Sequence, residues 1–205
     1  MSSVSLIRPA NDPATTELSN WGNALELDLR SSSVHSLRAN LYQGAGTRLA
    51  VEAELVSADA VFFFGHGGRS FLNGFSTVVV DAANVSRATG AIIAALACFS
   101  GAVLGPLAIS SGTTAYLGFD DAFLWLTGDP DHQFQPAVIE PLRELIVGPD
   151  NVQDCFNSIH TNLDNVFTYY KSGIGSGKFN SVLGWLVAAW SRDHLVLHGT
   201  TSATL

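Results

Sequence analysis

The chain has 205 residues, of which 47% are hydrophobic and 14% are charged. This composition is typical of a folded globular protein and excludes an intrinsically disordered chain. Ten Lys and Arg residues against 18 Asp and Glu residues give a formal net charge of −8, which argues against nucleic acid as a partner, because phosphate backbones are held by clustered basic side chains.

The hydrophobic pattern predicts strands that alternate with helices. A first strand is expected at Ser3–Arg8, and Asp12 or Thr15 is placed to cap a helix that runs to about Arg30. Two runs are apolar throughout, which is typical of buried parallel strands: Ala60–Phe64 and Ala91–Ala97. The other expected elements are, in chain order, a strand at Val34–Tyr42, a helix at Thr47–Ser57, a short strand at Thr77–Val80, a helical piece at Ala82–Thr89, a helix at Ala102–Ser111, a strand at Thr113–Phe119, a polar loop at Gly128–Pro136, helices at Ala137–Val147 and Asn151–Tyr170, a flexible segment at Ser172–Gly177, a helix at Leu183–Trp190 and a strand at His194–His198.

This order of elements predicts an α/β fold with a mostly parallel central sheet, in one domain over residues 1–205. From Ala88 to Phe119 no side chain carries a formal charge. The Ser, Gly, Pro and Thr residues in the middle of this run predict a buried strand, helix and strand, so no stable membrane insertion is expected.

The N-terminal residues lack the basic flank and long apolar stretch of a signal peptide. The two cysteines, Cys98 and Cys155, are too few for a disulfide framework, so a reducing, cytoplasmic location is expected. Cys155 lies among apolar residues of a predicted helix and is expected in the core.

Two reactive side chains follow the two apolar strands directly. His66 stands in Phe62–Gly68, and Cys98 stands in Leu96–Gly101. Neighbouring parallel strands end at the same edge of a sheet, where a His can take the proton of a thiol nucleophile. The backbone amides of Gly67 and Cys98 are candidates for an oxyanion hole. A helix is expected just after Cys98, and its N-terminal partial positive charge would favour a thiolate.

A hydrophobic strand that ends in His-Gly, followed by one that ends in Ala-Cys, resembles the caspase-like cysteine peptidases. The resemblance covers Ala60 to Asp121 and implies a three-layer caspase-like fold, with His66 as general base or acid and Cys98 as nucleophile. Cys98–Gly101 is most similar to the Cys-x-Ser-Gly pattern of CHAT-like members, a group related to metacaspases and gingipain-like enzymes. Leu96 and the later glycine depart from the caspase signature Gln-Ala-Cys-x-Gly, which argues against cleavage after Asp.

The resemblance also implies a substrate preference. In this fold the strand after the nucleophile borders the pocket for the residue that precedes the scissile bond, and here that strand runs into Asp120 and Asp121. Carboxylates in that pocket would bind Arg or Lys of a protein or peptide substrate. The resemblance implies no metal or organic cofactor. It does imply control by a regulatory protein partner or by processing, in a defence or cell-death pathway.

Other interpretations stay open at this point. Asp120 and Asp121 also suit the cap of a following helix. A caspase-like fold without catalysis would serve as a protein-interaction module, and Gly65–Gly68 would suit a Rossmann-like small-molecule binder. His194 and His198 lack the further ligands of a zinc site, and Gly173–Lys178 fails the spacing of a phosphate-binding loop.

Overall fold

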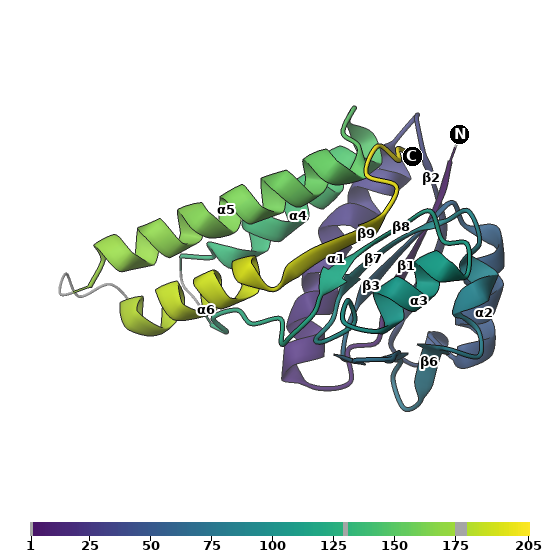
Figure 1. Cartoon of the computed structure of the whole chain (residues 1–205), viewed down its shortest axis with the longest axis horizontal. Helices are drawn as coiled ribbons and strands as arrows, with labels where there is room; N and C mark the ends of the chain where they lie inside the picture. The colour runs from purple at the N-terminus through teal and green to yellow at the C-terminus, as the bar shows by residue number, and fades with distance from the viewer. Residues whose placement is uncertain (1, 129–130, 175–179) are drawn as a thin grey trace.

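A six-stranded sheet in the order β2-β1-β3-β7-β8-β9 forms the centre of the molecule (Figure 1). The computed structural model describes residues 2–128, 131–174 and 180–205. Every neighbouring pair is parallel except β8 with β9. The mostly parallel α/β fold expected from the sequence is therefore confirmed. The strands are β1 (Ser3–Arg8), β2 (Ser36–Tyr42), β3 (Ala60–Phe64), β7 (Ile92–Leu96), β8 (Ala115–Phe119) and β9 (Leu195–Gly199).

Helices cover both faces of this sheet, which gives three layers. Phe62 and Phe64 of β3 pack in one core with α1, α4 and α5, while Val61 and Phe63 pack in a second core with α2 and α3. Successive strand residues point to opposite faces, so an all-apolar strand such as β3 joins both cores. The helices are α1 (Pro13–Ser31), α2 (Arg48–Ser57), α3 (Leu104–Ser110), α4 (Phe134–Val147), α5 (Val152–Ser172) and α6 (Ser181–Asp193).

A small antiparallel sheet lies beside the main one and begins directly after His66. Its strands are β4 (Gly67–Gly68), β5 (Phe71–Asn73) and β6 (Val78–Asp81). The sequence predicted a strand at Thr77–Val80 and missed the other two. Strands of two and three residues are too short to show an alternating pattern, which explains the omission.

Two more predictions need correction. The helical piece expected at Ala82–Thr89 is only a short 3₁₀ turn, Val85–Ala88. Helix α4 begins at Phe134, inside the expected polar loop Gly128–Pro136. Pro136 falls in the first turn of α4, where its missing N–H has no partner to lose, so it does not prevent the helix.

The expected flexible segment Ser172–Gly177 is partly helical, because α5 extends to Ser172. Residues 175–179 lie outside the described part of the chain, and so does the end of the Gly173–Lys178 motif. Across the described ranges, no helix has both the length and the apolar character to cross a membrane.

Candidate active site

His66 and Cys98 lie at the carboxyl ends of the neighbouring strands β3 and β7. In the register of this parallel pair, Phe64 is opposite Leu96. Each reactive residue stands two positions beyond the last residue of its strand. Both line one cavity of about 270 Å³ at this edge of the sheet. The fold therefore places a thiol and an imidazole where they can contact the same bound molecule.

The rest of this cavity, called here the cysteine cavity, is mostly apolar. Its walls come from the start of α1, from the ends of β3 and β7, and from the segment after β8. Apolar walls of this kind suit the apolar part of a bound side chain. The other lining residues are Ala14, Thr15, Leu18, Gly65, Leu96, Ala97, Phe123, Leu124, Trp125 and Thr127.

Asp12 forms a short hydrogen bond with His66, through the carboxylate Oδ2 and the ring Nε2. The same carboxylate caps α1, because its Oδ1 accepts the amide N–H of Thr15 at 2.8 Å. Burial raises the pKa of the Asp12 carboxyl, but the Thr15 amide and the His66 ring together outweigh it, and the pKa lies below its ordinary value. An ionised Asp12 accepts the Nε2 proton, which leaves Nδ1 of His66 as the basic nitrogen.

The sequence predicted Asp12 only as a helix cap and missed its contact with His66. The contact arises because β1 lies next to β3, with Ile7 opposite Phe63. The chain after β1 thus reaches the same edge as the chain after β3. The sequence did show a carboxylate soon after the expected first strand. To place this carboxylate beside His66, however, one must know that β1 and β3 are neighbours.

The Cys98 thiol is half-buried and donates a weak hydrogen bond to the carbonyl oxygen of Phe123, with Sγ and O 3.7 Å apart. Burial raises the pKa of this thiol above its ordinary value, and the charge of Asp121 raises it further. The thiolate expected from a helix N-terminus was therefore a wrong prediction. Helix α3 starts only at Leu104 and has seven residues, and the dipole effect fades within the first turn.

The turn that carries Cys98 has a strained backbone. Phe99 adopts a φ of +60°, a left-handed conformation that costs a bulky residue about 1–2 kcal/mol. Backbone hydrogen bonds hold the turn against the residues at the end of β8. Phe99 donates to the Asp121 carbonyl and Gly101 donates to the Phe119 carbonyl, each at 2.8 Å. Strain of this kind persists where the surroundings fix it, and it is frequent at active sites.

Comparison with known proteins gives a structural likeness without a sequence match. No family model and no curated protein matches the sequence. A crystal structure of the Arg-specific cysteine proteinase gingipain R superimposes with a TM-score of 0.64 at 15% identity, over 99% of this chain and 47% of that one. A complex of the pro- and mature domains of Porphyromonas gingivalis RgpB gives a TM-score of 0.62 at 13% identity, over 100% of this chain and 48% of that one.

The chain has a caspase-like fold. It spans about half the length of the gingipain chains that it matches. At these identities the likeness establishes the fold and leaves the chemistry to be argued from the side chains.

The two carboxylates predicted for substrate binding lie after β8 of this caspase-like fold, in different surroundings. Asp120 Oδ1 lies 2.8 Å from Nδ1 of His194. Asp121 Oδ1 accepts the Ala122 amide at 2.7 Å, and its charge acts on Cys98. Among the residues that the structure describes, neither one lines the cysteine cavity.

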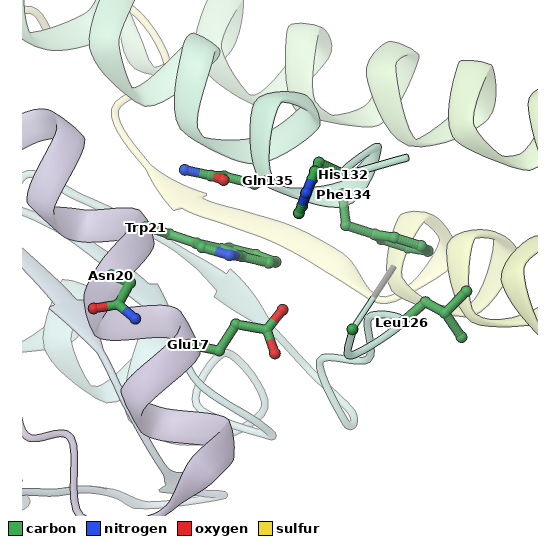
Figure 2. Close-up of a pocket in the computed structure, with 8 residues that line it drawn as sticks. Glu17, Asn20, Trp21, Leu126, His132, Phe134 and Gln135 are labelled. Atoms are coloured by element: carbon green, nitrogen blue, oxygen red, sulfur yellow. The ribbon is translucent and has the colours of Figure 1, made fainter. Parts of the chain in front are cut away.

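A second cavity of about 360 Å³, called here the Glu17 cavity, lies along α1 beside the cysteine cavity. Figure 2 shows the Glu17 side chain extending from α1 into it. Trp21 lines this cavity and Trp125 lines the cysteine cavity, and their rings meet edge to face with centroids 5.6 Å apart.

Within residues 2–128, 131–174 and 180–205, Glu17 forms no ion pair. Other lining residues are Asn20, Leu126, Gly128, His132, Phe134 and Gln135. The sequence analysis did not identify Glu17.

Gly67 lies against the backbone of the turn that carries Cys98, so we expect Gly67→Ala to disturb the site. A Cβ at this position would lie 2.7 Å from the Cys98 carbonyl oxygen and 2.9 Å from the Ala97 Cβ. Because the first of these is a backbone atom, the turn itself must shift, at an expected cost of about 1–3 kcal/mol. Denaturant unfolding measures this loss. Gly44→Ala is the matched control, since nothing lies within 4 Å of its added Cβ, and equal stability of the two variants would contradict the expectation.

Proposed function

We propose that the protein is a cysteine endopeptidase in which Cys98 is the nucleophile and His66 transfers protons. Asp12 orients the ring of His66. The observation that carries the proposal is that Cys98 and His66 line one cavity while Asp12 binds Nε2 of the same imidazole. A nucleophile, a base and a group that orients the base are the recurring parts of covalent acyl transfer.

The chemistry follows from the protonation states. Nδ1 of His66 takes the thiol proton as Cys98 Sγ bonds to the scissile carbonyl carbon, because burial keeps the resting thiol protonated. The backbone amides of Gly67 and Cys98 are proposed to bind the oxyanion of the tetrahedral intermediate. His66 then gives the proton to the leaving amine as the C–N bond breaks. Water, deprotonated by His66, hydrolyses the thioester and restores the thiol.

The substrate is proposed to carry Arg or Lys before the scissile bond. An Arg side chain has an apolar stem and a charged end, which suits the apolar cysteine cavity with a carboxylate beyond it. Glu17, which forms no ion pair among the residues that the structure describes, supplies a carboxylate beside aromatic walls, where a cation is favoured. Asp121 is a second proposed partner for the basic side chain, whereas Asp120 is paired with His194. The Arg-specific name of the structural neighbour agrees with this preference.

Control by a protein partner or by processing, in a defence or cell-death pathway, is also proposed. One structural neighbour is a complex of pro- and mature domains. A half-buried thiol whose pKa is raised by burial is compatible with such control.

Fluorogenic peptides that differ only in the residue before the scissile bond test this function. Arg and Lys peptides should be cleaved, and Asp peptides should not. Cys98→Ala should abolish cleavage, and this control excludes a contaminating peptidase. Cleavage of Asp peptides alone would refute the basic preference. No cleavage of any peptide, together with tight binding of a protein partner, would favour the interaction module.

The role of Glu17 gives a separate prediction. Glu17→Gln should lower kcat/KM for Arg peptides by about 10-fold or more, because a charge-assisted hydrogen bond is replaced by a neutral one. The kcat/KM for peptides with an uncharged residue before the scissile bond, which are expected to be cleaved more slowly, should change little. Glu144→Gln, at an exposed position on α4, is the matched control. An equal loss of kcat/KM on charged and uncharged peptides would show that Glu17 does not bind the basic side chain of the substrate.

A further inference from the structure

The strained turn from Ala97 to Gly101 carries the Cys98 thiol. Phe99, next to the nucleophile, has a left-handed backbone, and its amide and that of Gly101 are held by the carbonyls of Asp121 and Phe119. These contacts fix the far side of the turn after Cys98. They act on residues after Cys98, so a contact to the residue before the thiol would join the two ends of the turn.

Ser100 supplies that contact. Its Oγ donates a hydrogen bond to the carbonyl oxygen of Ala97, with the two oxygens 3.1 Å apart. The bond spans Cys98 and Phe99 and joins the two ends of the strained segment. Ser100 is fully buried, so no bulk water competes for this carbonyl.

The packing beneath Ser100 keeps its hydroxyl in place. A Cβ at Gly118 would lie 3.0 Å from Ser100 Oγ and 2.9 Å from Cε1 of Tyr116, so only a glycine leaves room for both side chains. Tyr116 is itself fully buried on β8. The hydroxyl of Ser100 is therefore confined between the turn and the core of the sheet.

We propose that Ser100 is a positioning residue, whose hydrogen bond to the Ala97 carbonyl holds the turn so that the Cys98 thiol stays in the cavity that His66 also lines. The inference rests on the proposed function for its effect on turnover, but the geometry of the turn can be tested without a substrate. Without the hydrogen bond from Ser100 to the Ala97 carbonyl, the turn relaxes from its strained form, and Cys98 moves away from the position that it needs for attack.

The test compares Ser100→Ala with Ser110→Ala. Ser110 forms the same kind of bond, from Oγ to the Leu107 carbonyl three residues earlier, at 2.9 Å but on an exposed position of α3. Two quantities are measured for each variant: kcat and KM on an Arg peptide, and the pH dependence of iodoacetamide alkylation of Cys98 by mass spectrometry. Buried Cys155 reports on the integrity of the fold.

Ser100→Ala should lower kcat by about 10-fold or more with KM nearly unchanged, because a small displacement of a nucleophile is costly. Its Cys98 alkylation should shift to lower pH, since a relaxed turn exposes the thiol whose burial raises its pKa. Ser110→Ala should change neither quantity.

An unchanged kcat and an unchanged pH dependence of alkylation in Ser100→Ala would overturn the proposed positioning role. So would a loss in which Cys155 also becomes reactive, because that indicates general destabilisation. If the wild-type chain cleaves no peptide, the proposed function fails, but the alkylation profile still decides the role of Ser100.

Discussion

His66→Ala is expected to lower kcat/KM on an Arg peptide by about 10²–10⁴-fold, the range that a positioned general acid or base contributes. The loss should be large because the pKa of the Cys98 thiol is raised by burial, so little thiolate exists near neutral pH without a base. Alanine removes both the base for attack and the acid for the leaving amine. Steady-state kinetics with the fluorogenic peptide measures the effect.

The control for this variant is His160→Ala, at an exposed position on α5. It removes an imidazole of the same chain that contacts neither Cys98 nor Asp12, and it should retain full activity. A His66→Ala variant that stays within a few-fold of the wild type would show that Cys98 does not depend on His66. The proposed division of roles would then be wrong.

Asp12→Asn is expected to lower kcat/KM by about 10²-fold or more, while the stability of the protein near neutral pH falls only by the contribution of the ionised carboxylate. Asn is as good an N-cap residue as Asp, so α1 keeps its cap. The amide removes the negative charge and places a donor against Nε2 of His66, which favours the tautomer protonated on Nδ1. That tautomer cannot accept the thiol proton. Kinetics and thermal unfolding, measured on the same preparation, separate the two effects.

Asp12→Ala completes the comparison because it removes the cap as well. It should lose activity and also about 0.5–2 kcal/mol of stability. Asn151→Ala is the matched control, since Asn151 caps α5 through a similar capping box. It should lose stability alone. Equal activity losses in Asp12→Ala and Asn151→Ala would indicate that Asp12 acts only as a cap.

The cap on α1 also implies a direction of pH dependence. The pKa of the Asp12 carboxyl is below its ordinary value in the folded protein. Its contribution to stability is therefore complete above the ordinary carboxyl pKa of about 4 and is lost as the pH falls through the lower, folded-state value. The stability of Asp12→Asn should lack this part of the acid dependence.

The sequence predicted the parts of the fold that rest on strong local patterns. Ala60–Phe64 and Ala91–Ala97 are apolar throughout, and the structure shows β3 and β7 within one residue of those bounds. The strands β4 and β5 carry almost no pattern, because one is two glycines and the other has three residues. They form through pairing with β6, which is a tertiary effect.

The candidate site, like the fold, could be predicted from the sequence only in part. His66 and Cys98 follow strands directly, so sheet topology brings them together and the sequence could indicate it. The contact of Asp12 with His66 depends on which strands are neighbours, which periodicity does not reveal. The raised pKa of Cys98 depends on burial, and the Glu17 cavity depends on how α1 packs against a distant segment. These features required the three-dimensional structure.

The most direct test of the central claim is covalent labelling by a peptidyl-arginine acyloxymethyl ketone, an electrophile that mimics a substrate with a basic residue. Intact mass and peptide mapping give the rate and the position of the label, with Cys155 as the internal control. The wild type should be labelled once, at Cys98, and His66→Ala should be labelled about 10²-fold more slowly. Labelling of Cys98 at the same rate in both proteins, or no label at Cys98, would contradict a catalytic partnership between Cys98 and His66.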